Sequence, residues 1–184
     1  MKSIATIQAR LGSSRLPNKV FKKIANKNLL EWQIERLAKS KEISDIIIST
    51  TTEHKDDEIE NFCIKNNLKY YRGSENNVLD RLSKTIETFS IEIHIECFGD
   101  SPLADYEVID EMINIYKSDP KLDFVSNSID PSFPSGLEVN IFSGKTLLDL
   151  NSKLDVHDPL REHGGYNITR FPEAYKIYSY KADK

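Results

Sequence analysis

Short apolar runs alternate with helix-type segments along most of this chain, and that order constrains the fold more than any other feature. Runs rich in β-branched residues are expected to be strands, and the stretches between them carry apolar residues at helical spacing. The expected strands cover residues 3–9, 45–51, 68–73, 91–98 and 123–127. Because parallel strands are joined by crossover helices, the sequence predicts an α/β fold, a three-layer α/β/α arrangement with a mostly parallel sheet.

The helical segments between these strands are marked by apolar stripes. One stripe in the first of them consists of Leu29, Leu30, Ile34 and Leu37. Asn28 precedes this stripe, and its side chain is able to cap a helix. Further helices are expected at residues 56–67, 76–89 and 108–116, with shorter ones at 144–151 and 159–168. Beyond residue 128 the pattern loosens into a loop at 129–136 and strands at 137–143 and 174–180.

The composition is that of an ordinary globular chain. Its 184 residues are enough for one domain with a sizeable core, and its formal net charge of -4 argues against nucleic acid as a partner. No apolar run suggests a signal peptide or a membrane span, so we expect a cytoplasmic protein with no membrane partner. Cys63 and Cys97 show no metal spacing, and Cys97 is expected to be a reduced core residue.

A cationic loop, IQARLGSSRLPNKV, runs from the end of the first expected strand. It holds three cations, one glycine and two serines: Arg10, Arg15, Lys19, Gly12, Ser13 and Ser14. Like charges in one loop repel each other unless an anion lies among them, and arginine and lysine both suit phosphate oxygens. The order matches neither a P-loop nor the dinucleotide fingerprint. The loop therefore indicates a local phosphate site, with a solvated surface loop as the alternative.

Other polar residues follow the remaining strands, at the edge where open parallel sheets bind ligands. Asp100, in GDSPL, is placed to hold Mg²⁺ against phosphate oxygens, with a helix cap or turn residue as the alternative. Asp80 and Arg81 do not share a helix face and, taken alone, are expected to be solvent-facing charges. The segment LREHGGYN lacks the ligand spacing of a zinc site, and we expect a structural or substrate-orienting role for it.

Taken in order, the stretches IQARLGSSRLPNKV, RGSENNVLDR, GDSPL and REH resemble the cytidylyltransferase family that includes the spore coat polysaccharide biosynthesis protein F group. More distantly, the chain is similar to the CMP-sialate and CMP-Kdo synthetases. The resemblance implies a nucleotide-diphospho-sugar-transferase-like, Rossmann-like fold with residues 1–184 as a single nucleotidyltransferase domain. It also implies a Mg²⁺-dependent reaction in which an acceptor oxygen attacks the α-phosphate of CTP and pyrophosphate leaves. The acceptor would be a sugar acid, a sugar phosphate or a related compound used in surface glycan synthesis.

The resemblance also implies roles for the candidate site residues. The catalytic residues would be Arg10, Lys19 and Asp100, with Asp100 as the metal ligand. The nucleotide would contact Gly12, Ser13, Ser14, Arg15, Thr51, Arg72, Asp80 and Arg81. The acceptor would contact Gly136, Glu138, Arg161, Glu162 and His163. No protein nucleophile is required, because positioning and electrostatics carry such transfers. A homodimer is implied by the resemblance alone.

Three features depart from the pattern of the relatives. Asn18 stands where relatives carry Gly, so the turn is expected to use the tolerance of asparagine for left-handed backbone. Glu96 occupies a position that is often basic, which would change the charge preference for the substrate. Relatives usually continue into a segment like R-L-T-V-D-x-x-x-D-L, with a candidate second metal ligand, and the domain is expected to lack it. Two alternatives stay open: transfer from GTP or another nucleotide, and a non-catalytic nucleotide-binding domain.

Overall fold

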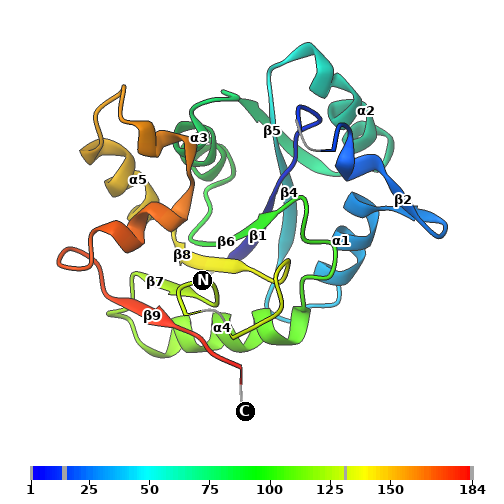
Figure 1. Cartoon of the computed structure of the whole chain (residues 1–184). Coiled ribbons are helices and arrows are strands. Elements are labelled where there is room, and N and C mark those ends of the chain that lie inside the picture. Colours follow the sequence, from blue (N-terminus) through cyan, green and yellow to red (C-terminus); the bar gives the residue numbers. More distant parts are fainter. Residues whose placement is uncertain (1, 14–15, 131, 183–184) are drawn as a thin grey trace.

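A seven-stranded sheet forms the centre of the structure (Figure 1), a computed structural model that describes residues 2–13, 16–130 and 132–182. Its strands are β1 Ser3–Gln8, β4 Asp45–Thr51, β5 Lys69–Gly73, β6 Ile93–Phe98, β7 Phe124–Ser126, β8 Val139–Ser143 and β9 Ile177–Ser179. The strand order is β5-β4-β1-β6-β8-β7-β9. Strands β5, β4, β1 and β6 run parallel, β8 is antiparallel to both β6 and β7, and β9 is parallel to β7. The expected mostly parallel sheet is confirmed.

Helices cover both faces of this sheet. They are α1 Leu29–Leu37, α2 Asp57–Lys65, α3 Val78–Phe89, α4 Tyr106–Ser118 and α5 Gly144–Lys153. Short 3-10 turns lie at η1 Lys19–Phe21, η2 His54–Asp56, η3 Pro159–Glu162 and η4 Gly165–Arg170. Buried residues of α1, α2 and α4 share one apolar cluster, whereas those of α3 and α5 belong to another. The three-layer arrangement expected from the sequence is therefore confirmed.

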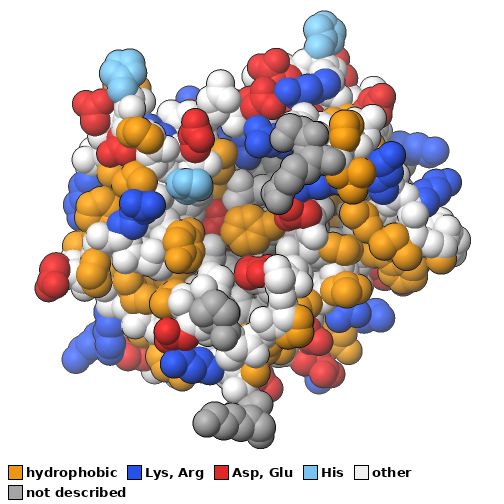
Figure 2. All heavy atoms as spheres, viewed as in Figure 1, with side chains coloured by type: hydrophobic (Ala, Val, Ile, Leu, Met, Phe, Trp, Pro, Cys, Tyr) orange, Lys and Arg blue, Asp and Glu red, His pale blue; other side chains and the backbone are white. Residues whose placement is uncertain are grey.

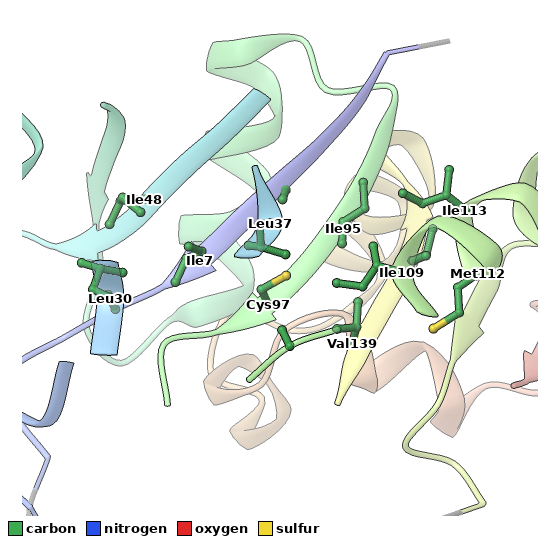
Figure 3. Close-up of a cluster of buried hydrophobic side chains, with 14 of the residues drawn as sticks. Ile7, Leu30, Leu37, Ile48, Ile95, Cys97, Ile109, Met112, Ile113 and Val139 are labelled. Atoms are coloured by element: carbon green, nitrogen blue, oxygen red, sulfur yellow. The ribbon is translucent and has the colours of Figure 1, made fainter. Parts of the chain in front are cut away.

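The two apolar clusters follow from the alternation of side chains along the strands. In β1, Ala5 and Ile7 belong to the cluster with α1 and α4, whereas Ile4 belongs to the cluster with α3 and α5. Figure 3 shows the first cluster, in which Ile7 of β1 and Cys97 of β6 lie among side chains from the helices. Each such buried apolar side chain contributes about 1.5–3 kcal/mol. Cys97 is a buried free cysteine, and its predicted place in the core is confirmed.

The start of α1 shows how local sequence sets a helix boundary. The Asn28 side chain accepts a hydrogen bond from the Glu31 amide at 2.8 Å, and the Glu31 carboxylate accepts one from the Asn28 amide at 2.7 Å. This capping box confirms Asn28 as the helix cap. The helix follows a small hairpin of β2 Lys23–Ile24 and β3 Lys27–Asn28, which the hydrophobic pattern does not predict.

The last third of the chain differs in detail from the expectation. The helix expected at residues 159–168 is divided into η3 and η4, because Gly164 adopts a non-helical backbone between them. None of the helices in the described ranges is long and apolar enough to cross a bilayer.

Candidate active site

A cavity of about 360 Å³ opens at the carboxyl ends of β1 and β6. Figure 2 shows this face of the molecule hollowed near its middle. The candidate residues of the sequence that line the cavity are Arg10, Gly12, Ser13, Lys19, Arg81, Glu96, Asp100, Glu162 and His163. They come from the loop after β1, from α3, from the end of β6 and from η3. The fold thus brings together segments that are far apart in the chain, at the edge where parallel sheets bind ligands.

The loop after β1 is held in shape by its own backbone and by a buried carboxylate. Asn18 adopts left-handed backbone with φ 55° and ψ 29°, as expected, and its amide donates to the Leu11 carbonyl at 3.2 Å. Asp56 is fully buried and accepts a hydrogen bond from the Leu11 amide at 2.7 Å. The predicted contacts of Ser14 and Arg15 lie outside the described residues.

The cations of this loop contact carboxylates around the cavity. The Lys19 ammonium lies 2.5 Å from Asp100 Oδ2, and a guanidinium nitrogen of Arg10 lies 3.4 Å from Glu75 Oε1. Lys55 contacts the same oxygen of Glu75 at 2.6 Å and holds the pKa of that carboxyl below its usual range. These carboxylates balance the cations, so an incoming polyanion would compete with them for Arg10 and Lys19.

Arg81 is a buried cation at the cavity wall and is 3% exposed. Its guanidinium donates to the Ser74 carbonyl at 2.7 Å and to the Gln8 side-chain oxygen at 3.4 Å. Burial lowers the pKa of Arg81 to about 10. The Nε of Arg81 has no hydrogen-bond partner among the described residues, so this N–H group is free to donate to a ligand. The prediction that Arg81, taken alone, faces solvent is wrong, because this face of α3 packs against the sheet.

Glu96 is fully buried in the floor of the cavity. Its carboxylate accepts hydrogen bonds from the Gln8 amide group at 2.7 Å, from Asn140 at 2.8 Å and from the Gly165 backbone at 3.1 Å. Burial raises the pKa of this carboxyl. A Cβ on Gly164 would lie 1.9 Å from Glu96 Oε1, so only glycine fits beside this carboxylate. Glu96 therefore fixes the segment that carries Glu162 and His163 along the cavity.

Three of the residues expected to contact the nucleotide lie outside the cavity lining. Thr51 is fully buried, and its hydroxyl donates to the Asp56 carboxylate. Arg72 donates to the Thr51 carbonyl at 2.8 Å and pairs with acidic residues of α2. Asp80 pairs with Lys84 at 2.8 Å, one helical turn away. Their polar groups contact other parts of the protein, and the contact of these three residues with the nucleotide stays a prediction.

The expected acceptor residues are also divided by the structure. Glu162 and His163 line the cavity, but Gly136 and Glu138 do not, and the Gly136 amide donates to the Glu138 carboxylate at 2.7 Å. Arg161 is 8% exposed, and its guanidinium donates to backbone carbonyls of α5 and its C-terminal end, including the Leu154 carbonyl at 3.1 Å. The structure thus gives Arg161 a structural role and turns it away from the cavity.

Gln8 and Glu75 are among the lining residues that were not identified as site residues from the sequence. Gln8 is the last residue of β1, so the rule that ligand sites follow strand ends could have identified it. Glu75 lies in the turn before α3, and its contact with Arg10 joins residues 65 apart in the chain. No local pattern marks such a contact.

Asp100 is an exposed carboxylate at the cavity rim. Within the described ranges, no group of three or more His, Cys, Asp or Glu side chains could form a complete metal cage. Mg²⁺ is commonly bound by one or two carboxylates together with substrate phosphates. A lone aspartate opposite a cationic loop fits that kind of shared site.

Several cations converge on one cavity at the edge of a parallel sheet, and such a site suits the phosphates of a nucleotide. Together, this fold and this site place the protein in the class of nucleotidyltransferases. The family model described as cytidylyltransferase matches residues 4–180. The chain belongs to the cytidylyltransferase family, which confirms the resemblance drawn from the motifs.

Individual relatives agree with this assignment. An uncharacterized protein of Methanocaldococcus jannaschii is 35% identical over 180 residues, covering 97% of this chain and 71% of that protein. The spore coat polysaccharide biosynthesis protein SpsF of Bacillus subtilis is 31% identical over 176 residues, covering 93% of this chain and 71% of SpsF.

Solved structures show the same fold. A cytidylyltransferase from Leptospira borgpetersenii matches with a TM-score of 0.93 and 31% identity, covering 100% of this chain and 77% of that one. A CMP:2-keto-3-deoxy-manno-octonic acid synthetase complexed with CTP matches with a TM-score of 0.75 at 15% identity, covering 99% of this chain and 90% of that one. The second likeness shows the fold alone.

Proposed function

We propose that this protein binds CTP with Mg²⁺ in the cavity and transfers CMP to a small sugar-type acceptor for surface glycan synthesis, releasing pyrophosphate. The observation that carries the proposal is the convergence of Arg10 and Lys19 with Asp100 at the cavity. Family membership supports the choice of CTP, and the name of SpsF supports a role in polysaccharide synthesis.

In the proposed reaction an acceptor oxygen forms a bond to the α-phosphorus of CTP. The bond from that phosphorus to the oxygen bridging to the β-phosphate breaks, and pyrophosphate leaves with both electrons of the bond. Arg10 and Lys19 would hold the phosphate oxygens and offset the charge that develops on them. When the acceptor is a hydroxyl, its proton must pass to a base, and Glu162 and His163 are titratable side chains on the cavity wall.

Asp100 is the residue that would hold Mg²⁺, which would supply charge neutralisation at the phosphates. Asp100 pairs with Lys19 in the structure. The same two residues would separate to serve different parts of the substrate, Lys19 the phosphates and Asp100 the metal.

Substitution of Lys19 tests the phosphate assignment. Lys19→Ala is expected to weaken CTP binding about 10- to 100-fold, because a hydrogen bond to a charged group contributes about 1.5–3 kcal/mol. Lys23→Ala, which removes an exposed lysine of β2 outside the cavity, is the matched control and should bind CTP like the parent. Isothermal titration calorimetry measures both constants. Equal CTP affinity in the two variants would reject Lys19 as a phosphate ligand.

A further inference from the structure

We propose that Lys55 is a positioning residue that keeps Arg10 available to the nucleotide phosphates, because it holds the carboxylate that would otherwise pair with Arg10. That carboxylate belongs to Glu75, on the cavity wall. Only the role of Arg10 at the phosphates rests on the proposed function, whereas the contacts among the three side chains are seen in the structure.

Two cations share a single oxygen of Glu75. The Lys55 ammonium donates to Glu75 Oε1 at 2.6 Å, and a guanidinium nitrogen of Arg10 lies 3.4 Å from the same atom. The Lys55 contact is as short as a charge-assisted hydrogen bond, whereas the Arg10 contact is long for one. The hydrogen bond from Lys55 is also the largest effect on the pKa of Glu75, which it lowers, with smaller effects from Arg10 and Arg81. Glu75 is therefore held mainly by Lys55 and only loosely by Arg10.

The backbone places Lys55 and Arg10 side by side. Lys55 is followed by Asp56, which is fully buried. The Asp56 carboxylate accepts a hydrogen bond at 2.7 Å from the amide of Leu11, the residue after Arg10. Figure 1 shows the two segments that this hydrogen bond joins, the loop after β1 and the turn before α2, next to each other. The two cations therefore start from fixed and neighbouring backbone positions.

Gly12 leaves the space through which Lys55 reaches Glu75. A Cβ on Gly12 would lie 2.6 Å from the Lys55 ammonium and 3.0 Å from Glu75 Oε1. The ion pair thus lies directly against the cationic loop, although Lys55 itself does not line the cavity. Lys55 is placed to act on the loop from outside the nucleotide site.

Removal of Lys55 would leave Arg10 as the ion-pair partner of Glu75 among the described residues. A nucleotide that recruits Arg10 would then have to separate this pair at a carboxylate that is only 18% exposed. Opposite charges attract more strongly in such a partly desolvated place than in water. With Lys55 present, Glu75 keeps a partner when Arg10 turns to the phosphates. Lys55 therefore favours nucleotide binding without a contact of its own to the nucleotide.

A double-mutant cycle separates this indirect effect from direct binding of phosphate by Lys55. Lys55→Ala is expected to weaken CTP binding by about three- to fivefold, the range that corresponds to one partly exposed ion pair. In the Glu75→Gln background the same substitution should change CTP affinity by less than about 1.5-fold, since no carboxylate is left for Lys55 to hold. Isothermal titration calorimetry of the parent, the two single variants and the double variant gives the four constants.

Two further variants serve as controls. Lys55→Arg keeps a cation that can pair with Glu75 and should bind CTP like the parent. Lys69→Ala removes a lysine that pairs with Asp45 at the amino ends of β5 and β4, away from the cavity. It loses the same charge and the same kind of ion pair as Lys55→Ala, so unchanged CTP affinity is expected. Circular dichroism checks that every variant is folded.

The cycle has outcomes that contradict the proposal. An equal loss of affinity from Lys55→Ala in the parent and in Glu75→Gln would show that Lys55 acts on the nucleotide directly, and would overturn it. Parental affinity of Lys55→Ala would overturn it as well. Failure of the parent to bind CTP would instead overturn the proposed function, and the role of Lys55 with it.

Discussion

Gly165→Ala is expected to lower the free energy of unfolding by about 3 kcal/mol, the upper end of the usual cost of overpacking a core. A Cβ at this position would lie 2.1 Å from Cε1 of Phe142 and 2.5 Å from its Cζ. Phe142 is fully buried, stacked on Phe124 and in edge contact with His94, so its ring has no free space to move into. For a chain of this length the melting temperature should fall by roughly 6–12 °C.

Gly12→Ala is the matched control for this prediction. A Cβ on Gly12 would meet the Lys55 ammonium at 2.6 Å, but this is the end of a flexible and partly exposed side chain that can turn away. Its cost should stay below about 1 kcal/mol. Thermal and urea unfolding followed by circular dichroism measure both variants. Equal stability of the two variants would contradict the close packing of Gly165 against Phe142.

Asp100→Asn is expected to change CTP binding in opposite directions with and without Mg²⁺. Without metal, the variant should bind CTP more tightly than the parent, because it removes an anion from the phosphate site and releases Lys19 from its 2.5 Å ion pair. With metal, the variant should bind CTP more weakly than the parent. The parent gains affinity from Mg²⁺, whereas the variant does not, because the amide is a much poorer ligand for Mg²⁺. Each difference should be about tenfold, the order expected for one charge-assisted contact.

Asp119→Asn provides the control for Asp100, since it removes a carboxylate that pairs with Lys176 outside the cavity. It should leave CTP affinity unchanged under both conditions. Calorimetric titrations of the parent and the two variants, with Mg²⁺ and with a chelator, give all the constants. A full Mg²⁺ response in Asp100→Asn would reject its role as the metal ligand.

The sheet could be predicted from the sequence because its strands are buried on both faces. The β-branched run at residues 45–51 predicts β4 with the ends that the structure shows, and the alternation at 91–98 predicts β6 to within two residues. The cationic loop was identified for a related reason, since it follows directly from a well-defined strand. Where strand ends are clear, the edge that binds ligands is also clear.

Side-chain direction could not be predicted in the same way. Thr51 and Arg72 lie at the carboxyl ends of the expected strands, but their polar groups contact Asp56 and acidic residues of α2. Arg161 stands beside two cavity residues in the chain and yet contacts α5. These outcomes depend on contacts between segments and on the break at Gly164, which hydrophobic periodicity does not encode. Sequence pattern located the site, whereas packing decided which residues line it.

Calorimetric titration of this chain with CTP, GTP, UTP and ATP, each with and without Mg²⁺, measures whether the cavity selects CTP and whether Mg²⁺ takes part in its binding. We expect CTP to bind more tightly than the other three nucleotides and Mg²⁺ to strengthen its binding, because the cationic loop and Asp100 act on one ligand. A preference for GTP would leave the fold and the phosphate site in place but contradict the use of CTP. Binding of no nucleotide under either condition would contradict the proposed function itself.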